Sequence, residues 1–181
     1  MHAHQWTRRA RTALVESSWI RHYLDTVELP SGKVIEFHAL EFPRKVVGVL
    51  PVGEDGRILL TLQYRYMTNA FSWEIPACNV DEGEDLLTGA RRELLEETGC
   101  SAEQVQLLYD FYPQIGRSDH HFHIYIAHGL RKLTEQLDPD EVAETKWFTT
   151  SEILGMFKDH SLRDGFTAFA ILLHLLDIKV G

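Results

Sequence analysis

Three closely spaced glutamates are the residues of this chain with the clearest potential for chemistry. Residues 92–99 read Arg-Glu-Leu-Leu-Glu-Glu-Thr-Gly, which places carboxylates at Glu93, Glu96 and Glu97. On an α-helix, which turns by about 100° per residue, these carboxylates fall within an arc of about 100°. Like charges this close repel, and hard divalent cations with oxygen ligands, Mg²⁺ above all, relieve that repulsion. For these residues alone, the alternative is a solvated acidic helix face.

The residues before this segment extend it into a longer pattern. The full pattern is Cys78-x5-Glu84-x7-Arg92-Glu93-Leu94-x-Glu96-Glu97-x-Gly99-Cys100. It resembles the signature of the Nudix hydrolases, Gly-x5-Glu-x7-Arg-Glu-apolar-x-Glu-Glu-x-Gly-apolar, and fits eight of its nine fixed positions. The exception is Cys78, where the family has a glycine that could adopt a positive φ at little cost.

The Nudix signature implies a loop–helix–loop that binds a divalent metal and cleaves a nucleoside diphosphate linked to another group. By position, Glu93 and Glu97 would be metal ligands and catalytic residues, and Glu96 would be a ligand or hold one in place. Mg²⁺ would be the cofactor, with Mn²⁺ as an alternative. Glu84 and Arg92 would brace the loop and the helix.

A similarity to one branch, the ADP-ribose pyrophosphatases, is carried by three further runs. They are Gln63-Tyr64-Arg65, Trp73-Glu74-Ile75-Pro76-Ala77 and Tyr112-Pro113-x-x-Gly116. In this branch the main-chain carbonyl just before the signature glycine binds metal, which corresponds to Ala77. Arg65 and Glu74 would contact the substrate, with a surface salt bridge as the alternative for Arg65. Gly116 and Ser118 would contact the substrate from a downstream loop.

An acidic loop downstream of the signature is expected to orient the attacking water. The loop Asp138-Pro139-Asp140-Glu141 stands just before an expected strand at 145–148. The resemblance favours Glu141 as the catalytic base, with Asp140 and Glu144 as rivals. A solvated acidic loop is the alternative for each of them.

A histidine cluster, His120-His121-x-His123, is the other candidate for metal chemistry. On a strand, His121 and His123 share a face while His120 points away, and the spacing places no fourth zinc ligand. A polar strand end whose His120 or His121 touches substrate is therefore the preferred interpretation.

Apolar runs and turn signals predict a mixed α/β fold. Strands are expected at 23–29, 34–40, 45–52, 58–65, 105–112, 120–127 and 144–148, and helices at 84–98, from 150, and at 164–177. Strands interleaved with helices, without a regular βαβ alternation, predict a mixed central sheet that includes 45–52 and 58–65 and is covered on both faces. This agrees with the α/β/α sandwich that the resemblance implies. The Arg-rich segment 8–14 is expected to be a frayed terminus.

The predicted N-terminal hairpin divides the chain into a strand extension, 1–42, and a Nudix domain, 43–181. In ADP-ribose pyrophosphatases such an extension mediates a domain-swapped homodimer and lends residues to the partner's site. The resemblance therefore implies a homodimer, with Trp19, Phe37 or a nearby aromatic stacking on the nucleotide base.

Composition and charge restrict the classes of function. The 181 residues carry 18 Lys+Arg and 27 Asp+Glu, a net charge of −9, which argues against general nucleic-acid binding. The chain shows neither a secretory signal nor an apolar run of the length that a membrane span needs. Its two cysteines, Cys78 and Cys100, fit no disulfide framework or zinc spacing. A cytoplasmic protein with a small nucleotide substrate is expected.

Three functions remain in competition at this point. The first is Mg²⁺-dependent hydrolysis of ADP-ribose or a similar nucleoside diphosphate sugar to AMP and a sugar phosphate. The second is the same chemistry on another nucleotide, such as GDP-mannose, a dinucleoside polyphosphate or a damaged nucleoside triphosphate. The third is a non-catalytic, Nudix-like binding or regulatory protein.

Overall fold

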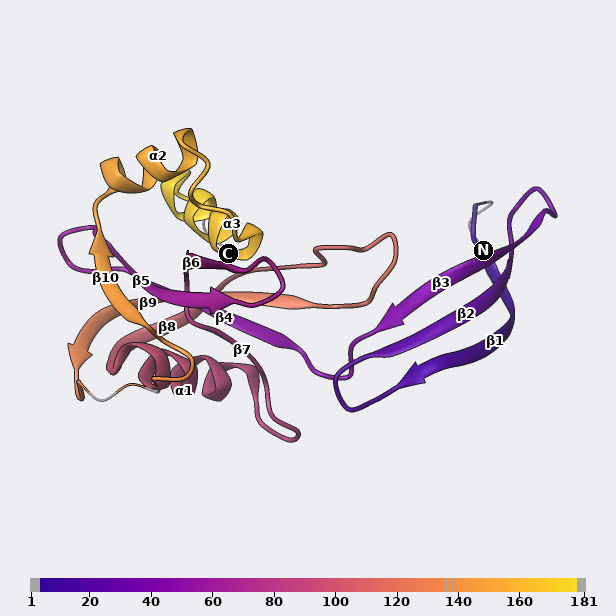
Figure 1. Ribbon diagram of the computed structural model, residues 1–181, viewed down its shortest axis with the longest axis horizontal. Coiled ribbons are helices and arrows are strands. Elements are labelled where there is room, and N and C mark those ends of the chain that lie inside the picture. The colour runs from indigo at the N-terminus through magenta and orange to yellow at the C-terminus, as the bar shows by residue number, and fades with distance from the viewer. Residues whose placement is uncertain (1–3, 136, 138, 179–181) are drawn as a thin grey trace. The chain divides into compact units, whose positions relative to one another are not determined.

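The computed structural model describes residues 4–135, 137 and 139–178. The chain divides into two compact units (Figure 1). The first holds the chain up to Lys45 together with Phe111–His121, and the second holds Val46–Asp110 and the chain from Phe122 onward. Each unit is described separately below.

The first unit is built on a three-stranded antiparallel sheet. Its strands are β1 (Thr7–Glu16), β2 (Arg21–Glu28) and β3 (Val34–Glu41), in that order across the sheet. The β2–β3 ladder runs from Arg21 opposite Glu41 to Glu28 opposite Val34, which confirms the predicted hairpin. 

The prediction of a frayed terminus at 8–14 is wrong, because this segment forms most of β1. Its basic residues find carboxylates across the sheet: Arg11 pairs with Asp25 at 2.7 Å and also with Glu41. Such cross-strand pairs join residues far apart in sequence, so a local reading of charge misses them.

The segment 111–121 completes the first unit. Leu40 of β3 forms a parallel bridge with Ser118, and its backbone N–H donates to the carbonyl of Arg117. The carboxylate of Asp119 accepts a hydrogen bond of 2.8 Å from the backbone N–H of Phe42. This loop is therefore attached to β3 and the residue after it by backbone contacts and by the side chain of Asp119.

The second unit contains two sheets. One has the strand order β7-β4-β9-β8 and the other β10-β5-β6. The bounds are β4 (Val46–Pro51), β5 (Ile58–Arg65), β6 (Ala70–Glu74), β7 (Ala77–Asn79), β8 (Cys100–Phe111), β9 (Phe122–Lys132) and β10 (Glu144–Phe148). Strand β4 runs parallel to β9 and antiparallel to β7, so the four-stranded sheet is mixed, as predicted.

The prediction of a single sheet containing 45–52 and 58–65 is wrong in one respect. These segments form β4 and β5, but they belong to different sheets, and the pairing between them is an isolated bridge between Val52 and Ile58. Strand β5 instead pairs with β6 and β10 along its length. Strands β6 and β7, which have only five and three residues, were not among the predicted strands.

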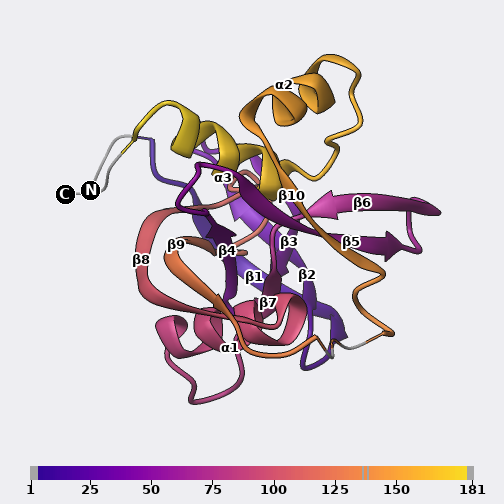
Figure 2. The same cartoon turned by 90° about the vertical axis from the view of Figure 1, so that its left-hand side faces the viewer.

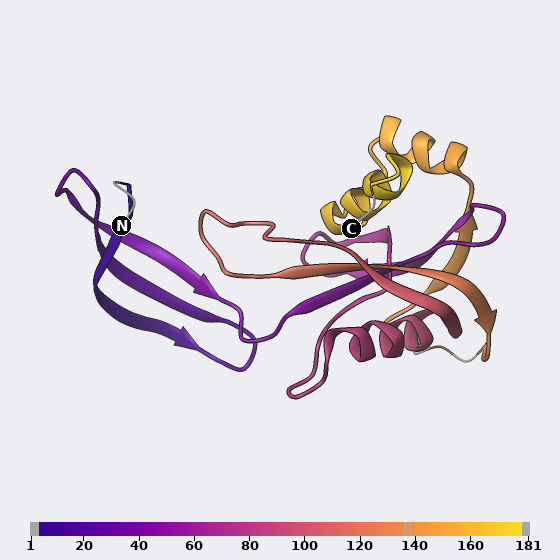
Figure 3. The same cartoon turned by 180° about the vertical axis from the view of Figure 1, so that it is seen from behind.

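Helices cover both faces of the second unit, as Figures 2 and 3 show. Helix α1 (Leu86–Thr98) lies on one face, and α2 (Thr150–Lys158) and α3 (Gly165–Leu175) lie on the other. This arrangement confirms the predicted α/β/α class. Among the described residues, none of the helices has the length and apolarity that crossing a membrane requires.

Both ends of α1 are fixed by the residues that the sequence supplies there. The Asp85 carboxylate accepts hydrogen bonds from the backbone N–H groups of Leu87 and Thr88. Gly99 ends the helix at φ 67°, and a Cβ at this position would lie 2.1 Å from the carbonyl oxygen of Thr134. Gly99, the second glycine of the signature, is thus required by its backbone conformation and by the close approach of Thr134.

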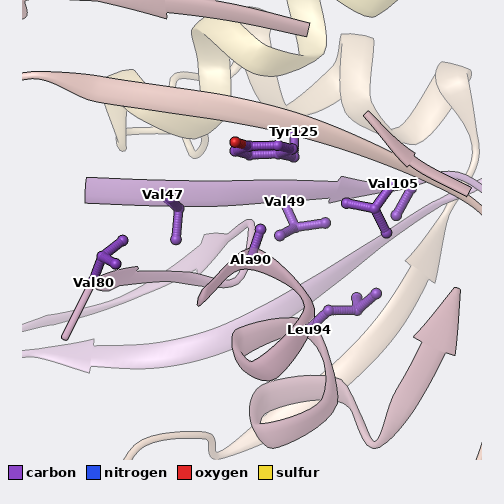
Figure 4. Close-up of a cluster of buried hydrophobic side chains, with 8 residues drawn as sticks. Val47, Val49, Val80, Ala90, Leu94, Val105 and Tyr125 are labelled. Atoms are coloured by element: carbon purple, nitrogen blue, oxygen red, sulfur yellow. The ribbon is translucent and has the colours of Figure 1, made fainter. Parts of the chain in front are cut away.

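The core between α1 and the four-stranded sheet is a cluster of apolar side chains, most of them valine or alanine (Figure 4). Ala90 and Leu94 point from α1 toward Val47 and Val49 of β4. All four side chains are almost completely buried. This contact determines which face of α1 meets the sheet, and so where its glutamates lie.

On the opposite face of β4, Gly48 leaves room for an aromatic ring of α3. A Cβ at Gly48 would lie 2.6 Å from Phe166 and 3.0 Å from Ile75. We expect Gly48→Ala to lower the free energy of unfolding by about 1–3 kcal/mol through overpacking, measured by urea denaturation. Gly155→Ala in α2 is the control, because a Cβ there has open space, and we expect a gain of about 0.5–1 kcal/mol. Equal stability of the two variants would contradict this packing.

Candidate functional site

Helix α1 places two of its three signature glutamates inside the protein and one outside. Glu93 and Glu97 are each only 4% exposed, whereas the side chain of Glu96 is 53% exposed. The reason is geometric: Ala90 and Leu94 set the buried face of the helix, and Glu93 and Glu97 flank that face while Glu96 lies beyond its edge. The three carboxylates therefore divide into a buried pair and an exposed third.

Glu97 is held from the neighbouring sheet by two side chains of β5. The amide of Gln63 donates to Glu97 Oε1 at 2.6 Å, and the hydroxyl of Thr61 lies within donating distance of Glu97 Oε2 at 3.2 Å. Both donors are buried. A buried carboxylate that accepts charge-assisted hydrogen bonds on both oxygens has a fixed orientation.

The buried pair is electrostatically strained when no cation is bound. Burial, and then the adjacent Glu93 carboxylate, raise the pKa of Glu97 to about 9, although the hydrogen bonds from Gln63 and Thr61 act in the opposite direction. Burial also raises the pKa of Glu93. Glu97 therefore retains its proton far above the usual range for carboxyls, and the pKa of Glu93 is shifted in the same direction.

Arg92 connects the loop before α1 to the exposed glutamate. Its guanidinium donates two hydrogen bonds of 3.0 Å to Glu84 and one of 2.8 Å to Glu96, the latter at i, i+4 spacing on the helix. It also lies 3.7 Å from the carboxylate of Glu93. Glu96 is thus bound to an arginine nitrogen that also lies near Glu93, and the charge of Glu96 contributes to the raised pKa of Glu93.

Cys78 takes the place of the signature glycine without backbone strain. The described non-glycine residues with positive φ are Asn69, His160 and Asp177, so Cys78 is not among them. Cys78 pairs with Val47 in the β4–β7 ladder, and its sulfur lies 3.7 Å from a guanidinium nitrogen of Arg92. Burial and the nearby Glu93 carboxylate raise the pKa of this thiol. The substitution is therefore compatible with the loop conformation.

Arg65 and Glu74 form an ion pair beside the acidic pair. The Arg65 guanidinium donates to both carboxylate oxygens of Glu74, with a shortest distance of 2.6 Å. Glu74 is buried, while the side chain of Arg65 is 47% exposed. The pKa of Arg65 is raised, chiefly by Glu74 and in part by the charge of Glu97. A cationic fork thus lies within the electrostatic reach of the buried carboxylates.

The oxygen donors of this site fit a hard divalent cation. Glu93 and Glu97 are adjacent carboxylates, and Ala77 lies in β7, next to β4. Within the part of the chain that the structure describes, no three His, Cys, Asp or Glu side chains gather closely enough to hold a metal by themselves. Mg²⁺ does not need such a group, because one or two carboxylates, waters and substrate phosphates complete its shell.

The remaining predicted substrate contacts lie in the first unit. Gly116 and Ser118 line a cavity of about 270 Å³ together with Phe37 of β3. Trp19 lies in the turn between β1 and β2, is 59% exposed, and has the Arg44 guanidinium 4.5 Å from its ring centre. Phe37 and the two loop residues are thus brought together, and Trp19 is not part of their cavity.

The acidic loop has its candidates on the surface. Asp140, Glu141 and Glu144 are exposed, and Asp138 lies outside the described residues. Glu144 stands opposite Leu62 in the β5–β10 ladder, whereas Thr61 stands opposite Thr145. Because alternate residues point to opposite faces of a sheet, Glu144 points away from the face that carries Thr61 and Gln63. The register therefore argues against Glu144 as the base.

The histidine cluster packs against aromatic rings. His120 stacks on Phe42 at 3.9 Å and His121 on Tyr112 at 4.3 Å between ring centres. His123 is buried, and its ring nitrogen lies 3.3 Å from the carbonyl oxygen of Val46. Each of the three rings thus has a close partner among the described residues.

Sequence reasoning missed Thr61 and Gln63. A signal was present: Thr61, Gln63 and Arg65 are polar residues at alternate positions of a strand whose other residues are mostly apolar. Such a stripe indicates that one face of the strand meets something polar. The glutamate that it meets lies 34 residues further along the chain from Gln63.

The chain shares features with known proteins along most of its length. The family model described as "NUDIX domain" matches residues 42–168. The chain is 33% identical over 164 residues to "ADP-ribose pyrophosphatase" of Bacillus subtilis (strain 168), covering 90% of this chain and 88% of the relative. It is 29% identical over 168 residues to "CMP-5'-(N-acetyl-N-hydroxy-3-aminopropyl)phosphonate hydrolase" of Streptomyces rubellomurinus, covering 93% and 81%.

A solved structure has the same fold. It is described as "Crystal structure of ADP compounds hydrolase", with a TM-score of 0.82 over 93% of this chain and 91% of the other. The sequence identity is 18%, so the likeness concerns the fold alone.

The buried acidic pair predicts a specific pH dependence of stability without metal. Since the folded-state pKa of Glu97 is about 9 against an ordinary value of 4.5, the folded protein holds a proton that the unfolded chain releases. Stability contributed by this proton is complete below about 4.5 and is lost as the pH rises toward about 9. In EDTA, the wild type should therefore lose free energy of unfolding relative to Glu97→Gln across this window. Urea denaturation over a pH series measures the difference, and a pH-independent difference would contradict the raised pKa.

Proposed function

This chain belongs to the Nudix family, and from that premise we propose that it hydrolyses the pyrophosphate bond of ADP-ribose or a similar nucleoside diphosphate sugar. It is a Nudix pyrophosphohydrolase. The proposed products are AMP, or the corresponding nucleoside monophosphate, and a sugar phosphate. The proposed cofactor is Mg²⁺, with Mn²⁺ as an alternative.

One juxtaposition carries the proposal: a buried pair of carboxylates beside an exposed arginine fork. Glu93 and Glu97 supply two anionic oxygen ligands, and Arg65 extends from the same polar face of β5 that holds Glu97. A pyrophosphate needs both. The carboxylates would hold a divalent cation and Arg65 adds a second positive charge, and together these would neutralise the pyrophosphate on an otherwise acidic protein of net charge −9.

Each residue of the site then has a proposed part. Glu93, Glu97 and the carbonyl of Ala77 would hold the divalent cation, which when bound polarises the pyrophosphate and lowers the pKa of water. Arg65 would donate to a phosphate or ribose oxygen, and Glu74 would keep its fork oriented through the hydrogen bonds described above.

Residues outside the pair have supporting parts. Arg92 would hold Glu84 on one side and Glu96 on the other, and so brace the loop against the helix. Glu96, paired with Arg92 and half exposed, would act on the metal shell indirectly. Glu141 would orient the attacking water. Asp140 is the alternative, because the β5–β10 register argues only against Glu144.

The first unit is proposed to serve dimerisation and recognition of the base. It carries exposed aromatic residues next to its strands, Trp6 just before β1 and Trp19 between β1 and β2. A homodimer that exchanges this unit would let Trp19 or Phe37 stack on the base, while Gly116 and Ser118 contact the substrate. A large flat ring on an exposed turn is suited to that role.

The relatives' names favour two substrate types. The name of the Bacillus relative supports ADP-ribose, and that of the Streptomyces relative supports a nucleotide bound to a different group. Both names describe a nucleotide with a linkage through phosphorus, which is the part of the substrate that the acidic pair and Arg65 would contact. Hydrolysis of another nucleotide is therefore the second candidate.

A cytoplasmic location is part of the proposal. Cys78 and Cys100 are both free thiols, which fits a reducing compartment.

The proposal is tested by turnover on a panel of nucleoside diphosphate compounds. With Mg²⁺, we expect the wild type to cleave ADP-ribose to AMP, identified by chromatography. Glu97→Gln should lower turnover about 100-fold or more while the protein stays folded, because a metal ligand matters more than an outer-shell partner, whose loss costs about 10–100-fold. Glu103→Gln makes the same change at an exposed ion pair with Arg131 and should leave turnover unchanged. Full activity of Glu97→Gln would remove this residue from the mechanism.

A further inference from the structure

Two polar side chains on β5 are buried at a cost that packing does not explain. Thr61 has no exposed surface and Gln63 is 5% exposed, in a strand that begins Ile58-Leu59-Leu60. A valine and a methionine would fill similar volumes without removing hydrogen-bonding groups from water. The cost of burying their polar atoms must therefore be offset by the hydrogen bonds that these atoms form.

The partners of these side chains converge on Glu97. The Gln63 amide nitrogen uses both hydrogens, one for Glu97 Oε1 at 2.6 Å and one for the Thr61 hydroxyl oxygen at 3.3 Å. The Thr61 hydroxyl has a single hydrogen and two acceptors within reach, Glu97 Oε2 at 3.2 Å and the main-chain carbonyl of Glu74 at 3.3 Å. The charged acceptor is the stronger one.

This arrangement fixes Glu97 without exhausting it. A carboxylate has about four acceptor positions, two on each oxygen. Gln63 and Thr61 occupy one on each oxygen, and a hydrogen bond with Glu93 uses a further position, so the carboxylate retains capacity for another partner. The two donors are also neutral, and so they orient the carboxylate without adding a charge that would compete with a cation.

We propose that Thr61 and Gln63 are positioning residues, which hold the Glu97 carboxylate in the orientation that binds the divalent cation. The inference rests on the proposed function, because it assigns these residues a part in that same site. Neither side chain would touch the substrate; each would act through Glu97.

The test is the affinity of the full-length protein for Mn²⁺, measured by the electron paramagnetic resonance signal of the free ion. Thr61→Val and Gln63→Met remove the donors and keep similar volume. We expect each to raise the Mn²⁺ dissociation constant about tenfold or more, as the loss of outer-shell partners does. Thr61→Ser, which keeps the hydroxyl, should bind close to the wild-type value.

A matched control is available across the sheet. Thr145 stands opposite Thr61 in the β5–β10 ladder, so Thr145→Val makes the same chemical change on the adjacent strand. We expect it to leave Mn²⁺ binding unchanged. In a parallel titration of turnover with Mg²⁺, the donor variants should need a higher Mg²⁺ concentration for half-maximal turnover. Their turnover should recover at saturating Mg²⁺.

The outcomes separate this inference from the function beneath it. If both donor variants fold and bind Mn²⁺ as tightly as the wild type does, the inference is overturned and the proposed function stays intact. A wild type that binds no Mn²⁺ would overturn both. If Thr61→Val does not melt cooperatively, Gln63→Met decides; if that variant also fails to fold, the two residues are structural and the inference is overturned.

Discussion

The rest of the site depends on the burial of two adjacent carboxylates at the edge of a helix face that packs on a sheet. Ala90 and Leu94 press α1 against β4, and that contact brings Glu93 and Glu97 into the interior with them. Burial of two like charges is unfavourable unless they share a proton or a cation. The apolar contact thus supplies the free energy that keeps the acidic pair in place. The pair in turn favours the binding of a proton or a cation.

The surrounding polar groups lie close to the buried pair but do not neutralise its charge. Arg92 is engaged by Glu84 and Glu96, and Arg65 by Glu74, so neither guanidinium forms its main contact with the buried pair. The neutral donors of β5 orient Glu97 but leave its charge uncompensated. This division of roles is what a metal-dependent pyrophosphohydrolase needs: ligands that are fixed in advance, and cationic side chains held next to them for phosphate.

How much of this could be foreseen depended on whether the determining contact was local in sequence. The spacing of Glu84, Arg92, Glu93 and Glu97 lies within one loop and one helix, so the sequence was sufficient to predict the family. The exposure of Glu96 was not predictable, because it depends on which face of α1 meets β4. Likewise β1 is stabilised by the pairing of Arg11 with Asp25, and Glu97 by Gln63, contacts that join distant segments.

Proton release on metal binding tests the central claim most directly. Titration calorimetry of the wild type with Mg²⁺ or Mn²⁺ at about pH 8, in buffers with different ionisation enthalpies, counts the protons released per ion. Because the pKa of Glu97 lies at about 9 without metal, binding should expel about one proton per ion. Saturable metal binding with no proton release would contradict a buried carboxyl pair that exchanges its proton for the cation.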